Sequence, residues 1–173
     1  SRIEAMRALA YYTAGQMDRA QGHADAAERE KAMTTVELLT PIVKGWCTEN
    51  AQGITSDGVQ VHGGMGFIEE TGAAQHQRDA RITTIYEGTT AIQANDLLGR
   101  KLARDGGKAM RGLITAMTED ARALEQHPDA AIADLSAALL RSITAMSEAS
   151  ALLLERHSVA PRETAAAAVP YLK

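Results

Sequence analysis

Apolar residues recur at steps of three and four positions along most of the chain, and this spacing predicts packed helices and not a sheet. The first apolar face predicts a helix that ends near Gly22, and a second helix is expected to begin near Ala26. The first face contains Ile3, Met6, Ala10, Thr13, Met17 and Ala20, and the second contains Ala32, Val36 and Leu39.

Pro41 interrupts this second helical pattern. Because proline cannot donate a backbone N–H and its ring crowds the preceding turn, we expect a kink or a fresh helix start over residues 41–46. A third helical piece is then expected from about Asn50 to Gln60.

Two longer apolar stripes follow a break at Asp105-Gly106-Gly107. One ends at Pro128 and the other runs to about Arg156, so they predict an antiparallel hairpin of long helices. The expected fold is therefore all-α, with an up-and-down helical bundle over residues 1–104 and an additional long helical hairpin over residues 105–173. The stripes contain Met110, Leu113, Ile114, Met117, Ala121 and Leu124, and then Ile132, Leu135, Leu139, Ile143, Met146 and Leu153.

Composition and charge exclude several classes of function. The formal net charge is −4 with both signs scattered, so no basic stripe for nucleic acid or an anionic membrane is present. We expect no membrane span and find no secretion signal. The single cysteine, Cys47, cannot form an internal disulfide and is expected to be a small buried hydrophobe, compatible with a reducing, cytoplasmic compartment. Because the chain begins at Ser1 within a helical pattern, we expect a fragment of a longer polypeptide.

Three glycines within four positions, Gly63, Gly64 and Gly66, follow Gln60. Glycine is costly inside a helix, so the cluster marks a place where backbone conformation or the close approach of another group matters. A phosphate-bearing ligand is one such group. The alternative is that Gly63 only ends a helix.

Residues 63–84 are expected to be irregular, because glycines and polar residues interrupt any helical period. A loop of this length inside a compact domain is more often functional than not. After it, Thr89 or Thr90 is expected to cap a helix over residues 91–104 through its hydroxyl group.

A single carboxylate, Glu87, lies between Tyr86 and Gly88, directly before this expected helix start. That position holds the carboxylate on a turn and not on a solvated helix face. The alternative interpretation is that Glu87 only complements the helix dipole.

These segments resemble one protein family. The order QVHGGMGF over residues 60–67, followed by RDARITTIYEGTTAIQ over residues 78–93, is similar to the C-terminal helical domain of the flavin-dependent acyl-CoA dehydrogenases. The sequence LLGRKL over residues 97–102, with further helices after it, resembles the long-form members that carry a C-terminal helical extension.

The resemblance implies that the parent protein uses FAD to oxidise an acyl-CoA to the trans-2-enoyl-CoA. Glu87 matches the base that removes the alpha proton, and its backbone N–H would help to hold the thioester oxygen. Tyr86 and Gly88 would line the substrate channel. The chemistry requires a desolvated carboxylate and hydrogen bonds to the enolate-like oxygen.

The resemblance also implies a set of flavin contacts. Gly63 and Gly64 match the segment that touches the diphosphate, and Gln60, followed by Val61 and His62, would reach the adenosine side from a neighbouring subunit. Thr89, Thr90 and Ala91 match positions near the flavin of the subunit that carries the base.

The implied partners are an acyl-CoA substrate, electron-transferring flavoprotein and further copies of the chain in a homo-dimer or homo-tetramer. Two other functions stay open: an acyl-CoA oxidase, and a non-catalytic relative such as the DNA-associated alkylation-response flavoproteins or a helical assembly module. The acyl chain is not determined by these residues.

The remaining candidates are interpreted as structural. His23, His76, His127 and His157 are scattered, so we expect no metal site. The group Arg78, Asp79 and Arg81 is expected to form an ion-pair network that pins the loop, with a contact to coenzyme A as the alternative.

Overall fold

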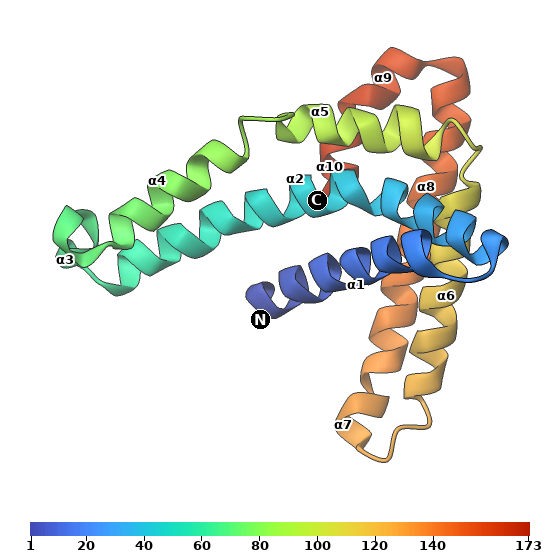
Figure 1. The fold of residues 1–173 in the computed structure, drawn as a ribbon, viewed down its shortest axis with the longest axis horizontal. Helices are drawn as coiled ribbons and strands as arrows, with labels where there is room; N and C mark the ends of the chain where they lie inside the picture. Colours follow the sequence, from blue (N-terminus) through green and yellow to red (C-terminus); the bar gives the residue numbers. More distant parts are fainter. The chain divides into compact units, whose positions relative to one another are not determined.

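The computed structural model describes residues 1–173 and contains helices without strands, which confirms the predicted all-α fold (Figure 1). The helices are α1 (Arg2–Gly22), α2 (Ala26–Val61), α3 (Gly64–Phe67), the 3₁₀ turn η1 (Glu69–Thr71), α4 (Ala73–Thr83), α5 (Thr90–Asn95), the π-helical η2 (Asp96–Leu102), α6 (Lys108–Leu124), α7 (Ala130–Ala133), α8 (Leu135–Val159), α9 (Pro161–Ala166) and α10 (Ala168–Leu172).

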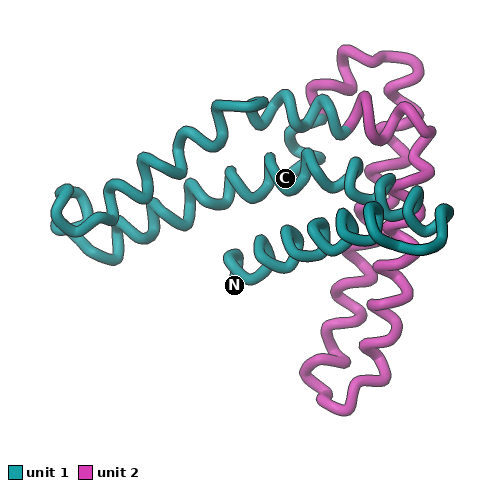
Figure 2. The backbone as a smooth tube through the Cα atoms, viewed as in Figure 1, with its two compact units in different colours: residues 1–97, 168–173 teal, residues 98–167 magenta.

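The chain divides into two compact units (Figure 2). Unit 1 contains Ser1–Leu97 together with Ala168–Lys173, and unit 2 contains Leu98–Ala167. In unit 1, α1, α4 and α5 all pack against α2, and α10 packs against α5 and α2. In unit 2, α6 and α8 form the predicted long hairpin, with α7 and α9 packed on α8.

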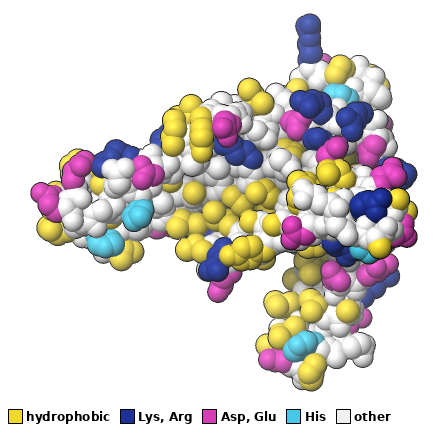
Figure 3. All heavy atoms as spheres, viewed as in Figure 1, with side chains coloured by type: hydrophobic (Ala, Val, Ile, Leu, Met, Phe, Trp, Pro, Cys, Tyr) yellow, Lys and Arg dark blue, Asp and Glu magenta, His cyan; other side chains and the backbone are white.

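The α1–α2 pair of unit 1 is fixed at both of its ends. Arg19 pairs with Glu28 at 2.8 Å across the connecting turn, and Arg2 pairs with Asp57 at 2.5 Å at the far end. No residue of α1 is buried, whereas α2 supplies much of the core of unit 1. Figure 3 shows apolar side chains gathered along the middle of unit 1, over α2, with charges of both signs interspersed around them.

The expected fresh helix start at Pro41 is wrong, because α2 continues through this residue to Val61, and the expected kink stays a prediction. The expected separate helix from Asn50 is therefore part of α2 as well. Pro41 is fully buried, and the core packing of its turn outweighs the missing backbone hydrogen bond. The hydroxyl of Thr40 donates to the carbonyl of Val36 at 2.7 Å in the turn before the proline.

The expected irregular chain over residues 63–84 is also wrong. Only short connections separate α3, η1 and α4 there, and Gly63 and Gly72 make the turns with φ of 58° and 76°. The expected helix over residues 91–104 begins one residue earlier and turns π-helical from Asp96. The break at residues 105–107 is confirmed, since Gly106 and Gly107 have φ of 63° and 79°.

One helical segment, Ala130–Val159, is long and apolar enough to cross a membrane by length and composition alone. The expectation that no apolar run reaches the length of a membrane span is therefore wrong for this segment. Over α8 up to Leu154, only Arg141 and Glu148 carry charge, and alanine and serine fill the spaces between leucines. Such a composition is weak evidence for a span, because helices packed inside globular domains share it.

Candidate functional site

The turn between α4 and α5 holds Glu87 in an unusual backbone conformation. Its φ of 52° makes it the one non-glycine residue of the chain with a positive φ. A residue with a Cβ atom in this region costs about 1–2 kcal/mol relative to ordinary backbone. Gly88 follows with φ of 95°, so two consecutive residues leave the common conformations. Strain of this kind is concentrated at functional turns, where the surrounding structure holds it.

The helix after this turn explains part of its geometry. Thr89 is the N-cap of α5, and its hydroxyl accepts a hydrogen bond from the Ile92 N–H at 3.4 Å, which confirms the predicted cap. The Gln93 side-chain amide donates to the Glu87 carbonyl at 3.4 Å. A Cβ atom on Gly88 would lie 2.4 Å from Gln93 Nε2, so any side chain at position 88 would displace the Gln93 amide from its bond to Glu87, and it would also be strained by the φ of 95°.

A lysine from α2 supports the other side of the turn. Lys44 Nζ donates to the carbonyl of Thr83 in the last turn of α4 and lies 4.9 Å from the centroid of the Tyr86 ring. A cation at a helix C-terminus and over an aromatic face is favourable in both places. Lys44 was missed in the sequence, although it is the single charge in the apolar run over residues 41–47.

A second carboxylate, Glu49, lies behind the start of α5. It accepts a hydrogen bond from the Thr90 hydroxyl at 2.6 Å and pairs with Lys173 Nζ at 2.8 Å. The hydrogen bonds from Lys173 and Thr90 hold the pKa of the Glu49 carboxyl below its usual value, and the charges of Lys173 and Arg81 add to this effect. Glu49 was also missed, because its two partners lie 41 and 124 positions away in the sequence.

The chain leaves the Glu87 turn open to solvent. Glu87 is exposed, and Tyr86 retains 48% of its accessible surface. The desolvated environment that alpha-proton removal requires is therefore not formed within residues 1–173. What this chain does supply is the position of the carboxylate and the conformation of its backbone.

The glycine segment lies at the end of α2. Gln60 and Val61 form its last turn, His62 is the C-cap, and Gly63 follows with φ of 58° and ψ of −143°, a region that only glycine adopts readily. Gly63 N–H donates to the Gln60 carbonyl at 3.0 Å, so it ends the helix, as the alternative interpretation proposed. Open space surrounds the Cβ direction of Gly64.

Gly66 has a different, purely structural reason to be glycine. A Cβ atom there would lie 2.1 Å from the carbonyl oxygen of Val59, so α3 can fold back on α2 only without a side chain at this position. The three glycines therefore have different roles: Gly63 forms the turn, Gly64 faces open space, and Gly66 allows α3 to pack on α2. The Cβ directions of Gly63 and Gly64 both face open space, but the Gly63 N–H already donates to the Gln60 carbonyl.

The structure brings the predicted residues together in two groups and not in one. Tyr86, Glu87 and Gly88 lie directly before the group Thr89, Thr90 and Ala91 at one end of α4, and residues 60–64 lie near the other end (Figure 1). A helix of the length of α4 spans about 16 Å.

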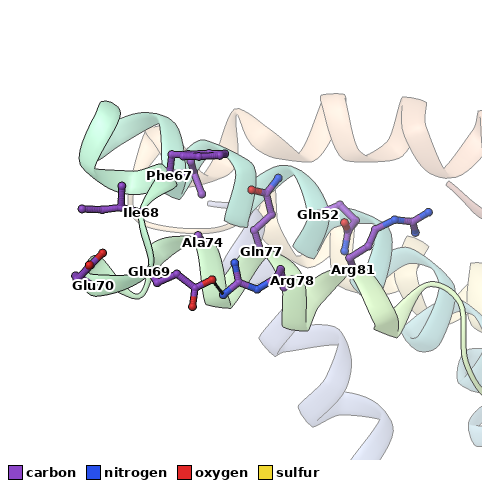
Figure 4. Close-up of a pocket in the computed structure, with 10 residues that line it drawn as sticks. Gln52, Phe67, Ile68, Glu69, Glu70, Ala74, Gln77, Arg78 and Arg81 are labelled. Carbon is purple, nitrogen blue, oxygen red and sulfur yellow. Dashed lines mark ion pairs between the residues drawn. The ribbon is translucent and has the colours of Figure 1, made fainter.

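A cleft of about 660 Å³ lies between α2 and α4, lined by residues such as Gln52, Phe67 and Arg78 (Figure 4). It contains neither Glu87 nor Gly64, so it is not the predicted site. Arg78 pairs with Glu69 of η1 at 3.0 Å at the edge of this cleft. The expected ion-pair network within an irregular loop is therefore wrong. Arg78 lies on the helix α4, and its ion pair joins α4 to η1.

The two other members of that expected network also lie on α4 and bind polar neighbours. Asp79 accepts a hydrogen bond from Gln75 at 2.7 Å, and Arg81 donates to the Thr84 hydroxyl at 2.5 Å. Cys47 is half-buried and not fully buried as expected, and this partial burial raises the pKa of its thiol, which favours the neutral form.

Comparison with known proteins assigns these features to one family. Residues 1–102 match the family described as acyl-CoA dehydrogenase, C-terminal domain. Over 108 residues the chain is 61% identical to 3-methylmercaptopropionyl-CoA dehydrogenase of Ruegeria pomeroyi and 40% identical to the broad-specificity linear acyl-CoA dehydrogenase FadE5 of Mycobacterium tuberculosis. Each alignment covers 62% of this chain and 18% of the relative, so the chain spans a small part of these proteins.

A solved structure shares the fold over almost the whole chain. Bd2924 in its apo form aligns with a TM-score of 0.63 and 22% identity, and the alignment covers 95% of this chain and 27% of that one. This likeness concerns the fold alone. The family match over residues 1–102 rests on sequence, and on that basis the chain belongs to the acyl-CoA dehydrogenase family.

Proposed function

We propose that this chain is the C-terminal part of an FAD-dependent acyl-CoA dehydrogenase, which oxidises an acyl-CoA to the trans-2-enoyl-CoA, and that Glu87 is the base. One observation carries the proposal. The carboxylate at the family's base position is also the one non-glycine residue held at a positive φ. A residue that only complemented a helix dipole would not need this conformation.

In this mechanism the Glu87 carboxylate takes the proton from the alpha carbon of the thioester. The electron pair of that C–H bond forms the new double bond as hydride leaves the beta carbon. When FAD is bound, it supplies the acceptor for that hydride. The backbone N–H of Glu87 donates no hydrogen bond within the chain, so it is free to donate to the thioester oxygen.

The residues present fit an extended dinucleotide. Gly64 offers open backbone to a diphosphate, and Gly63 contributes by fixing the turn, since its own N–H is used within the chain. We propose that Gln60, Val61 and His62 contact the adenosine side. At the other end of α4, Thr89, Thr90 and Ala91 would contact the flavin of a different FAD, the one beside Glu87, and Tyr86 and Gly88 would contact the acyl chain.

The separation of these two groups supports self-association. Because the whole of α4, about 16 Å long, lies between them, we propose that Glu87 serves one flavin site and that the glycine segment serves the site of another copy in a homo-dimer or homo-tetramer. The same parent would pass electrons to electron-transferring flavoprotein in the cytoplasm.

The relatives suggest which substrates to test first. The Ruegeria pomeroyi relative is named for 3-methylmercaptopropionyl-CoA and the Mycobacterium tuberculosis relative for linear acyl-CoAs. We propose a short or sulfur-containing acyl-CoA, because 61% identity to the first exceeds 40% identity to the second.

The test is to mix the full-length, FAD-loaded enzyme with a panel of acyl-CoAs in the absence of oxygen and to follow bleaching of the flavin. Rapid bleaching by one class of acyl-CoA is expected. A flavin that no acyl-CoA bleaches would contradict the proposal and favour a non-catalytic relative. Admitting oxygen after reduction separates a dehydrogenase, whose flavin stays reduced, from an oxidase.

A further inference from the structure

The last helix of the chain, α10, is an integral part of unit 1. Ala168 and Leu172 retain only 1% and 4% of their accessible surface. On α2, Gly45 is buried under Leu172, and a Cβ atom on Gly45 would lie 2.8 Å from Leu172 Cδ2. A larger residue at position 45 would force the Leu172 side chain or α10 itself to shift, so the close packing of the two helices depends on glycine at this position.

Lys173, directly after α10, joins a short series of polar contacts. Lys173 Nζ binds Glu49 Oε2 at 2.8 Å, and the Thr90 hydroxyl donates to Glu49 Oε1 at 2.6 Å. Each oxygen of one carboxylate on α2 therefore holds a different element. Thr90 is the first residue of α5, two positions after the Glu87–Gly88 turn.

We infer that Lys173, Glu49 and Thr90 form a positioning relay, through which α10 fixes the start of α5 and with it the turn that carries Glu87. The inference rests on the proposed function, because it assigns these residues to the orientation of that base. Lys173 and Glu49 lie behind α5 and act on the reaction only through Thr90.

The relay also sets the chemistry of Thr90. Because the Thr90 O–H donates to Glu49, the hydroxyl oxygen can only accept further hydrogen bonds. A group bound at Thr90 must then present an N–H or O–H donor. Lys173 holds the carboxylate charged and in place, and a hydrogen bond to a charged acceptor is about twice as strong as a neutral one.

A purely structural role is the alternative, and exposure separates the two. The side chains of Lys173 and Glu49 retain 47% and 31% of their accessible surface. An ion pair this exposed contributes little to folding. Its loss should therefore lower stability only slightly, while it disturbs the orientation of Thr90 and the turn before it.

The experiment uses the full-length, FAD-loaded enzyme with matched variants. Thr90→Val removes the hydroxyl and Thr90→Ser keeps it, Lys173→Met removes the charge and Lys173→Arg keeps it, and Glu49→Gln neutralises the carboxylate. The readouts are the rate constant of flavin reduction at saturating acyl-CoA, the half-saturating acyl-CoA concentration, and the urea unfolding midpoint.

We expect Thr90→Val, Glu49→Gln and Lys173→Met each to slow flavin reduction about tenfold, with the half-saturating concentration within about twofold of the wild type. The Ser and Arg variants should reduce at close to the wild-type rate. The Glu49→Gln, Thr90→Val double variant should be no slower than the slower single variant, because both interrupt the same relay. A wild-type rate in Lys173→Met and Glu49→Gln, or a double variant about a hundredfold slow, would overturn the inference.

Failure of the proposed function gives a different result. If none of the acyl-CoAs reduces the flavin of the wild-type enzyme, the base assignment fails. The relay is then tested by urea unfolding alone. A double-mutant cycle between Lys173→Met and Thr90→Val then decides. The two residues do not touch, so non-additive effects support coupling through Glu49, and additive effects overturn it.

Discussion

Gln93 and Glu87 are joined by a hydrogen bond from the side-chain amide of the first to the carbonyl oxygen of the second, at 3.4 Å. The bond connects the first turn of α5 to the strained turn before it, and Gly88 lies between the two residues. The packing of Gln93 against Gly88 and the positive φ of Glu87 thus belong to one arrangement. The turn that carries Glu87 is held by local contacts that this chain supplies itself.

This arrangement predicts the effect of Gly88→Ala. The added methyl group would meet Gln93 Nε2 at 2.4 Å, and alanine disfavours a φ of 95°. We expect a loss of about 1–3 kcal/mol in the free energy of unfolding, with flavin reduction slowed more strongly than binding of acyl-CoA. Urea unfolding and rapid-mixing kinetics of the full-length enzyme measure both.

The matched control is Gly112→Ala on α6, where an added Cβ atom meets nothing within 4 Å. Alanine is favoured over glycine in a helix interior by about 0.5–1 kcal/mol, so this variant should be slightly more stable. If Gly88→Ala behaves like Gly112→Ala, the turn is not under the constraint described.

The two glycines at the end of α2 should respond differently to substitution. Gly64→Val is expected to weaken FAD retention without unfolding the protein, because its side chain would occupy open space within this chain. Gly63→Val should also reduce stability, since its φ of 58° and ψ of −143° disfavour a branched residue. The measurement is the fraction of FAD retained after gel filtration, alongside the thermal unfolding midpoint. Full FAD retention in Gly64→Val would leave this segment as a helix end only.

Glu49 predicts a specific dependence of stability on pH. Its pKa is lowered in the folded protein, chiefly by the hydrogen bonds from Lys173 and Thr90. The unfolded chain therefore binds a proton at higher pH than the folded chain does. The stabilisation is present above the ordinary value of 4.5 and is lost as the pH falls through the folded-state pKa.

The test compares the wild type with Glu49→Gln in urea, from neutral pH to below pH 4.5. The difference between their unfolding midpoints should shrink as the pH falls, because the variant has no proton to bind at this position. A difference that stays constant over that range would show that the pair with Lys173 does not contribute.

The sequence predicts the parts of this fold that local chemistry determines. The cap at Thr89, the break at residues 105–107 and the long α6–α8 hairpin follow from a hydroxyl, two glycines and two apolar stripes. The expectation at Pro41 fails because the cost of a proline is local, whereas its complete burial depends on the packing of the folded chain.

The candidate site divides in the same way. Glu87 and Gly64 are found from short motifs, whereas Lys44 and Glu49 act across 39 to 124 positions of the chain. No periodicity or spacing brings such partners together. The positive φ of Glu87 likewise cannot be read from the residue type, since glutamate rarely adopts it.

The central claim is that Glu87 removes the alpha proton, and Glu87→Gln in the full-length enzyme tests it most directly. The amide keeps the size of the side chain and its backbone N–H but cannot accept the proton, so FAD and acyl-CoA should still bind. Flavin reduction by the best acyl-CoA should slow by several orders of magnitude, beyond the factor of about 10²–10⁴ usual for a general base, because solvent cannot replace the base in a closed site. A variant that reduces its flavin at close to the wild-type rate would contradict the assignment and place the base elsewhere in the protein.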